Sequence, residues 1–327
     1  MGKPSGPSMR IALAVEGTRG DVHPMFALGA SLIARGHEIV VCAPPDFQSE
    51  AEERGMRFES VGISVREYLT EKAHAVASGG LAMLREGRSY AEASLRAQFQ
   101  RLPEATADAD AVIAAGVQLA ARSAAELRGV PYRYVAYCPA LLPSAEYPPA
   151  LLSLRSLPRW ANRLSWRILL ALQERWLGGV LNREREALGL APVRDVFRHL
   201  LKQRPVLAAD RELAPCPRDC PFDVEQVPCL HPLQGAPLPP KLEAFLEQGP
   251  PPVYLGFGSM TDPDPGATTR ALLEALTRLG CRALISRGWA GLADGPLPEG
   301  VLAIGAVSHA ELFPRLAAVV HHGGAGT

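Results

Sequence analysis

The sequence predicts an α/β fold of two doubly wound domains, each with a parallel sheet between layers of helices. Short apolar runs, such as residues 9–15 and 253–256, alternate with segments of helical composition, and buried parallel strands have this apolar character. The chain has 327 residues, of which 47% are hydrophobic, and no net charge. This length allows roughly two globular domains.

The first half of the chain predicts a strand–helix–strand–helix–strand unit, which favours right-handed crossovers within one sheet. Strands are expected at 9–15, 37–43 and 57–61, and helices at 24–35 and 47–54. Asp46 is expected to cap the second of these helices. Further strands are predicted at 111–115, 132–138 and 206–209, with helices at 70–101, 118–127 and 157–188.

The second half predicts another domain of the same type. Its strands are expected at 253–256, 282–286, 301–304 and 317–320, the last of them buried, and its helices at 242–247, 268–279 and 310–316. A proline-rich stretch without periodicity precedes this domain. We therefore divide the chain into a leader at 1–8, a first domain at 9–214, a linker at 215–240 and the first half of a second domain at 241–327.

The composition excludes several classes of function. A balanced charge gives no support for nucleic acid or an anionic membrane as the main partner. No apolar run reaches the roughly 18 residues of a membrane-spanning helix, and no signal peptide is recognisable. Six cysteines in a chain of this length do not make a disulfide scaffold. We therefore expect a cytoplasmic protein.

Asp21 is the first candidate for chemistry, because it lies in a glycine-containing loop directly after the first predicted strand. Ligands of open α/β sheets bind at the carboxyl ends of the strands. A carboxylate at that place can accept a proton from an attacking hydroxyl, or it can cap the helix that follows. His23, two residues further on, is an alternative base.

The stretch His-His-Gly-Gly-Ala-Gly-Thr at 321–327 is the second candidate. Glycines after a strand let the backbone come close to a ligand, and the start of a following helix would bind a phosphate. A simple strand and turn would use the same glycines. Both interpretations follow from these residues alone.

Four blocks of sequence together carry a resemblance to a known family. They are Gly-Thr-Arg-Gly-Asp-Val at 17–22, Pro-Val-Tyr-Leu-Gly-Phe-Gly-Ser at 252–259, Ser-Arg-Gly-Trp at 286–289 and the glycine stretch at 321–327. In this order they resemble GT-B glycosyltransferases, and most closely the bacterial enzymes that decorate glycopeptide antibiotics, macrolides and sterols, such as the vancomycin group. The likeness implies two Rossmann-like domains that face a cleft, the second of them incomplete.

The resemblance assigns roles to individual residues. It makes Asp21 the general base that activates the acceptor, and it puts Thr18 and Arg19 in the cleft near the donor or the acceptor. Tyr137 and Tyr147 lie in the segment that resembles the acceptor side. The donor side would comprise Ser259, Trp289, Val307, His309, His322, Gly324, Ala325, Gly326 and Thr327.

Three of the donor-side residues have more than one possible role or a specific one. Trp289 would lie near the nucleoside or pack in the core. Val307 would present its backbone to a pyrimidine base. His309 occupies the position where relatives of this type carry a conserved glutamine, so its role stays open.

The resemblance implies a hexosyltransferase that needs no cofactor. A UDP- or dTDP-sugar would be the co-substrate, and a small lipophilic natural product or sterol-like molecule would accept the sugar. The resemblance also implies that transfer inverts the anomeric centre and needs no metal. The family's Asp-Gln pair, which contacts the sugar hydroxyls, would follow residue 327. We therefore expect a C-terminally truncated chain with little or no activity.

Other interpretations remain open. A non-hydrolysing nucleotide-sugar epimerase or an inactive partner protein would share the architecture. Cys216, Cys220, Cys229 and His231 could be zinc ligands, although their spacing is unusual and we expect no metal site. Arginines beside the tryptophans of 157–188 indicate either packing between domains or a weak membrane contact. The sequence does not predict the oligomeric state.

Overall fold

The fold is given by a computed structural model, which describes residues 7–72, 80–149, 152, 157–231 and 237–324. Contacts between residues divide the chain into two units. Unit 1 comprises Met1–Tyr68 and Leu84–His231, and unit 2 comprises Leu69–Met83 and Pro232–Thr327. Each unit has its own sheet.

Unit 1 is built on a seven-stranded parallel sheet with the strand order β3-β2-β1-β4-β5-β6-β7. The strands are β1 (Arg10–Glu16), β2 (Glu38–Ala43), β3 (Arg57–Ser60), β4 (Ala111–Gly116), β5 (Tyr132–Ala136), β6 (Val206–Ala208) and β7 (Glu225–Val227). Ala12, Leu13 and Ala14 of β1 are fully buried. A strand covered on both faces needs such an uninterrupted apolar run.

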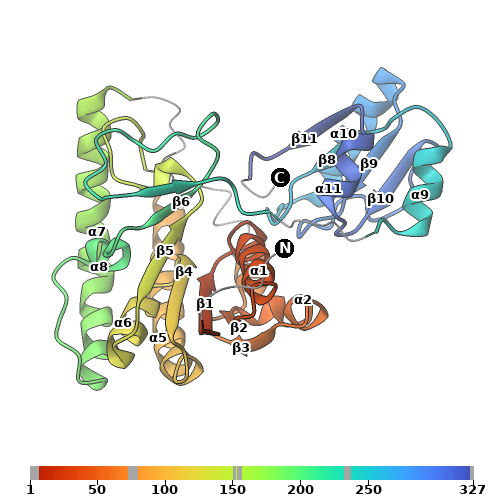
Figure 1. The fold of residues 1–327 in the computed structure, drawn as a ribbon. Coiled ribbons are helices and arrows are strands. Elements are labelled where there is room, and N and C mark those ends of the chain that lie inside the picture. The colour runs from red at the N-terminus through yellow and green to blue at the C-terminus, as the bar shows by residue number, and fades with distance from the viewer. Residues whose placement is uncertain (1–6, 73–79, 150–151, 153–156, 232–236, 325–327) are drawn as a thin grey trace. The chain divides into compact units, whose positions relative to one another are not determined.

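Helices cover both faces of this sheet. Those before residue 232 are α1 (Arg19–Ile33), α2 (Gln48–Glu53), α3 (Val65–Glu71), α5 (Gly80–Ala105), α6 (Ala121–Arg128), α7 (Arg159–Ala187) and α8 (Val196–Leu201), with short 3-10 turns η1 (Pro45–Phe47) and η2 (Pro139–Leu141). In Figure 1, α1 and α2 lie on one side of the sheet and α6 and α7 on the other. Leu95, Leu102 and Leu181 join α5 and α7 to β1, β4 and β5 in one core.

Unit 2 is a smaller doubly wound layer structure. Its parallel sheet has the order β10-β9-β8-β11, with strands β8 (Val253–Gly256), β9 (Ala283–Ser286), β10 (Val301–Ile304) and β11 (Ala318–His321). Its helices are α9 (Pro240–Glu247), α10 (Pro265–Leu279) and α11 (His309–Leu312), followed by the turn η3 (Phe313–Arg315).

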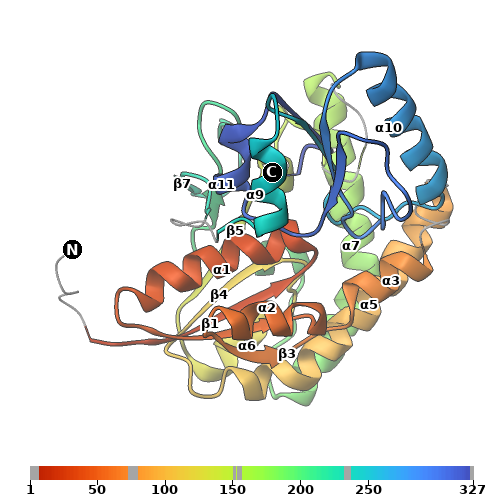
Figure 2. The same ribbon diagram turned by 90° about the vertical axis from the view of Figure 1, so that its right-hand side faces the viewer.

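Alternate residues of the strands in unit 2 enter two separate cores. Tyr254 and Leu284 pack with α9 and α11, whereas Leu255 and Ile285 pack with α10. Figure 2 shows α10 on one side of the blue strands and α9 and α11 on the other. This two-sided burial follows from the period of two residues in a strand.

The helix after β1 begins earlier than the sequence predicted. The expected start at Pro24 is wrong, because α1 begins at Arg19 and contains Pro24. Thr18 takes the N-cap position with an extended backbone, and the Asp21 carboxylate accepts the backbone N–H of Thr18 at 2.9 Å. Such a carboxylate in the first turn satisfies an N–H that has no helical partner. Asp21 therefore lies in the first helical turn and not in a loop.

Three further expectations were wrong in their local detail. Asp46 does not cap α2; its carboxylate accepts Ser64 Oγ and the N–H of Val65, both at 2.8 Å, at the start of α3. Residues 225–227, expected in the linker, form the edge strand β7. The strand β11, expected to be buried, is an edge strand with mostly exposed side chains.

Candidate active site

The predicted base lies at the carboxyl ends of β1 and β4. The strand β1 pairs with β2 on one side and with β4 on the other. Strands β2 and β3 are thus added on one side of β1, and β4 and β5 are added on the other side. Ligands of open α/β sheets bind at such a switch point. Gly116 ends β4 here, and a Cβ on Gly116 would lie 3.5 Å from the Cβ of Asp21. The geometry thus brings Asp21 to the edge where a ligand crevice is expected in unit 1.

A backbone N–H holds the Asp21 side chain, and a glycine leaves room for it. Its Oδ2 accepts the Thr18 N–H, and a Cβ on Gly17 would overlap this oxygen. Gly17 has φ of 153°, a conformation that other residues rarely adopt. The predicted acceptor residue Tyr137 donates its hydroxyl to the Asp21 carbonyl at 2.9 Å. Tyr137 is itself buried, so it supports the first turn of α1.

The surroundings of Asp21 make its carboxyl a stronger base than an exposed aspartate. Burial raises the pKa of Asp21 from 3.8 to about 6, while the hydrogen bonds from Thr18 act in the opposite direction. A general base works best when its pKa lies near the working pH. Asp21 can therefore be ionised at neutral pH and still bind a proton readily.

Glu16, the last residue of β1, is a second acidic group that sequence reasoning missed. It is fully buried, and its Oε1 accepts the hydroxyl of Tyr90 at 2.5 Å. Burial raises the pKa of Glu16 from 4.5 to about 7, despite hydrogen bonds from Tyr90 and Ser94 that lower it. Its Oε2 has no hydrogen-bond partner among the described residues. An acidic residue at the end of an apolar strand was the available signal.

The alternative base His23 is engaged elsewhere. Its Nε2 lies 2.9 Å from Oε2 of Glu50 on α2, and the guanidinium of Arg54 lies 3.7 Å from the same carboxylate. Arg19, predicted to line the cleft, has its Nε 3.8 Å from Oε1 of Glu50. Glu50 therefore holds the side chains of His23 and Arg19 close to α2.

Tyr147, the second predicted acceptor residue, is placed by the tryptophan helix. Its carbonyl accepts the indole N–H of Trp166 at 2.9 Å. Trp166 is buried, whereas Trp160 at the start of the same helix is 68% exposed. Two tryptophans of α7 thus differ, since Trp166 is packed beside Tyr147 and Trp160 is open to solvent.

The predicted donor loops meet at the carboxyl edge of the sheet in unit 2. The strands β8 and β11 are neighbours, and the order of the sheet makes this pair the switch point of unit 2. A Cβ on Gly258, after β8, would lie 2.9 Å from Cε1 of His322, after β11. A Cβ on Gly324 would overlap the same imidazole. Glycines on both sides therefore let the ring of His322 lie close to the backbone.

The loop after β9 joins the same group. The backbone N–H of Trp289 donates to the carbonyl of Gly258 at 3.0 Å. Gly288 has φ of 53°, and a Cβ there would lie 2.5 Å from that carbonyl oxygen. Residues from three of the four sequence blocks thus lie together at this edge of the sheet.

The remaining predicted donor residues lie in different environments. Ser259 Oγ is buried and has no hydrogen-bond partner among the described residues. Val307 packs against the core formed with α9 and α11. His309 stacks on Phe313, with 4.3 Å between the ring centroids. Ala325, Gly326 and Thr327 lie outside the described residues.

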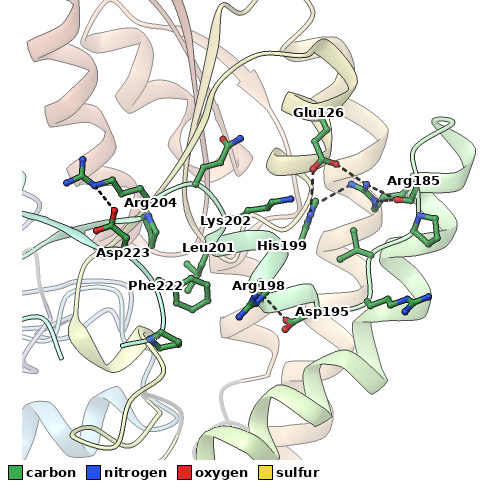
Figure 3. A pocket seen from close by; sticks show the side chains of 17 residues that line it. Glu126, Arg185, Asp195, Arg198, His199, Leu201, Lys202, Arg204, Phe222 and Asp223 are labelled. Atoms are coloured by element: carbon green, nitrogen blue, oxygen red, sulfur yellow. Dashed lines mark hydrogen bonds and ion pairs between the residues drawn. The ribbon is translucent and has the colours of Figure 1, made fainter. Parts of the chain in front are cut away.

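A pocket of about 740 Å³ lies at the opposite edge of unit 1, near the amino end of β6. Figure 3 shows Arg185 and His199 beside Glu126 on its wall. The guanidinium of Arg185 lies 2.9 Å from the Glu126 carboxylate, and burial lowers the pKa of His199 to about 4. The buried Arg185 and His199 and the half-buried Glu126 contact one another, so they join α6, α7 and α8. The pocket is separate from the Asp21 edge.

The described part of the chain shows neither a metal-binding cluster nor a membrane-spanning helix. No group of three or more His, Cys, Asp or Glu side chains in the described part of the chain is arranged to hold a metal ion, Cys216, Cys220, Cys229 and His231 included. Within the same residues, no helix has the length and apolar character needed to cross a bilayer.

Comparisons with known proteins identify the family. Residues 11–145 match the glycosyltransferase family 28 N-terminal domain. Glycosyltransferase GtfE of Amycolatopsis orientalis is 39% identical and aligns with 98% of this chain and 77% of its own length. The vancomycin aglycone glucosyltransferase of the same organism is 38% identical with the same coverage. This chain belongs to the vancomycin-group glycosyltransferases.

A solved structure supports the fold of this vancomycin-group chain. The Streptomyces sp. SF2575 glycosyltransferase SsfS6, solved with thymidine diphosphate, gives a TM-score of 0.60 at 19% identity. The match covers 97% of this chain and 77% of that one. The predicted α/β class and the GT-B architecture are confirmed, as is the predicted glycosyltransferase activity class.

Proposed function

We propose that this glycosyltransferase moves a sugar from a UDP- or dTDP-sugar to a hydroxyl of a small lipophilic natural product or sterol-like acceptor, with inversion and without a metal. The observation that carries the proposal is the Asp21 carboxylate. It lies at the switch point of unit 1, and its pKa is raised by burial to about 6. A base with this proton affinity suits the activation of an alcohol.

The reaction is a single displacement at the anomeric carbon. Asp21 removes the proton of the acceptor hydroxyl as its oxygen forms a bond to that carbon. The bond from the anomeric carbon to the diphosphate oxygen breaks, and the nucleoside diphosphate leaves with the electron pair. Because attack and departure occur on opposite faces, one such step inverts the configuration.

The loops at the carboxyl edge of unit 2 would hold the leaving diphosphate. Backbone N–H groups directed at developing negative charge stabilise it without reorganisation. Partial burial and the neighbouring His321 lower the pKa of His322, so its neutral imidazole can donate one hydrogen bond. The buried Ser259 Oγ lacks a partner among the described residues, and a phosphate oxygen would supply one. The protein itself then needs no cofactor.

The acceptor class rests on two observations. The relative that is 38% identical is a vancomycin aglycone glucosyltransferase, which acts on a natural product. Val117 directly follows Gly116 at the switch point, and its side chain is 43% exposed. An exposed apolar side chain at the end of β4 suits a lipophilic acceptor. No observation favours the epimerase or an inactive partner over transfer.

The stereochemistry of the product tests this proposal. Single turnover with the enzyme in excess reveals slow transfer, and NMR coupling constants at the anomeric carbon report the configuration. We expect inversion relative to the donor sugar, and an unchanged rate after treatment with a chelator. Retained configuration, or epimerisation of the donor sugar in the absence of acceptor, would contradict the proposal.

A further inference from the structure

The first three turns of α7 expose an apolar stripe that the proposed reaction does not use. Trp160, Leu164 and Ile168 are 68%, 48% and 52% exposed. Their spacing of four residues puts them on one face of the helix. The solvent-facing side of a packed helix normally carries polar residues. Three large exposed apolar side chains on one face therefore form a patch whose contact with water is unfavourable.

Arginines flank this stripe on one side. Arg159, Arg163 and Arg167 each precede one of the three apolar residues, and all three are exposed. The sequence of α7 contains no acidic residue before Glu174. The stripe and its arginines are called the α7 face below, and α7 is the long green helix of Figure 1.

Acidic neighbours reduce the charge of the α7 face only in part. Arg159 lies 3.1 Å from Asp219 and 3.7 Å from Glu146, and Arg163 lies 3.9 Å from Asp219. The arginines of these pairs are exposed and the two carboxylates are 26% exposed, and ion pairs open to solvent are weak. Arg167 has no hydrogen-bond or ion-pair partner within the described residues. The face therefore keeps a positive margin beside its apolar stripe.

We propose that the α7 face docks the protein on the surface of an anionic lipid bilayer. Tryptophan, leucine and isoleucine enter the boundary between headgroups and acyl chains, while adjacent arginines contact phosphate groups. A neutral apolar partner would satisfy the stripe alone, whereas an anionic bilayer complements both the stripe and its arginines. The stripe is too short to span a membrane, so the contact is peripheral. The inference concerns binding and does not depend on the reaction.

Vesicle sedimentation tests the docking surface. We expect the protein to sediment with vesicles of phosphatidylcholine and phosphatidylglycerol, more weakly at high salt, and not with phosphatidylcholine alone. Replacing Trp160, Leu164 and Ile168 together by Gln should lower the partition coefficient by more than about tenfold. Replacing Arg163 and Arg167 by Gln should lower it by about tenfold or more, since each arginine near an anionic surface contributes roughly fivefold.

Matched variants separate the α7 face from general effects. Leu213→Gln removes another exposed leucine of unit 1, and Arg194→Gln with Arg198→Gln removes two charges from other exposed positions. Both variants should sediment like the wild type. The fluorescence of the wild type should shift to the blue on anionic vesicles, and Trp160→Phe should abolish the shift.

Three results would overturn the proposal. The first is absence of sedimentation by the wild type. The second is equal partitioning of the α7 variants and their controls. The third is a lipid-free dimer that the triple Gln variant abolishes, because a second copy of the chain would then occupy the face. Circular dichroism of each variant checks that α7 remains folded.

Discussion

The Asp21 carboxylate serves the fold and the proposed chemistry with the same atoms. It accepts the N–H of Thr18 at the start of α1, and it lies beside the end of β4. The sequence left a helix cap and a general base as alternatives. The structure shows the hydrogen bond at the start of α1, and the role of a base stays a prediction. Position in the first turn of α1 fixes the carboxylate, and burial raises its pKa to about 6.

Glu16 gives a prediction about stability and pH. Its folded pKa is about 7 against 4.5 for the free side chain, so the folded state binds a proton that the unfolded state releases. Stability from this group is fully present below about pH 4.5 and is lost as the pH rises through about 7. Glu16→Gln cannot ionise and keeps an acceptor for Tyr90. At pH 8 its free energy of unfolding should exceed that of the wild type by up to about 3 kcal/mol.

Urea denaturation at pH 5 and pH 8 measures this difference. At pH 5 the gain should shrink to less than about 1 kcal/mol. Glu38→Gln is the control, since Glu38 lies exposed on the neighbouring strand β2, and it should change stability by less than about 0.5 kcal/mol at either pH. Equal stability of Glu16→Gln and the wild type at both values would show that Glu16 is not a buried neutral acid.

At the scale of the elements, the loops after β8 and β9 meet through their backbones. Gly288 and Gly291 both have positive φ, of 53° and 70°. A Cβ at Gly288 would lie 2.5 Å from the Gly258 carbonyl, whereas a Cβ at Gly291 meets nothing within 4 Å. The two glycines therefore share a left-handed backbone, but only Gly288 lacks room for a Cβ.

Alanine at these two glycines tests the donor arrangement. Each change costs about 1–2 kcal/mol for the left-handed backbone, but only Gly288→Ala also displaces the loop after β8. We expect Gly288→Ala to weaken the binding of UDP or dTDP by about tenfold or more, and Gly291→Ala to change it by less than about twofold. Isothermal calorimetry supplies both values. Equal losses of affinity in the two variants would contradict the prediction that the contact between these loops supports donor binding.

Local sequence explains which elements were predictable. The strand β1 and the four strands of unit 2 were found within one or two residues, because each is a short apolar run bounded by glycine, proline or polar residues. The strand β7 and the helix α8 have only three and six residues, too few for a hydrophobic period to emerge. The expectation that β11 is buried was wrong, because composition does not reveal which strand lies at the edge of a sheet.

Candidate residues were predictable only where a motif marked them. Asp21 and His322 belong to such motifs, and the structure brings each to a switch point. Glu16 pairs with Tyr90 across 74 residues of sequence, and Asp46 pairs with Ser64, the residue before α3. No local pattern contains these pairings, because the fold creates them.

The whole molecule repeats one arrangement in two units. Each unit is a parallel sheet with helices on both faces, and each brings its motif residues to the carboxyl edge of its sheet. Unit 1 carries the Asp21 carboxylate at this edge, and unit 2 carries a glycine-lined backbone with His322. The proposed transfer assigns the acceptor to the first unit and the diphosphate to the second.

The role of Asp21 is tested most directly by Asp21→Asn in a single-turnover transfer assay. Asparagine keeps an oxygen that can accept the Thr18 N–H, so the start of α1 is preserved, but it cannot remove a proton. We predict a fall in the transfer rate of about 10²- to 10⁴-fold with unchanged binding of UDP or dTDP. Asp195→Asn, which alters the cap of α8, should leave the rate unchanged. Wild-type transfer rates in Asp21→Asn would contradict the proposal that Asp21 is the base.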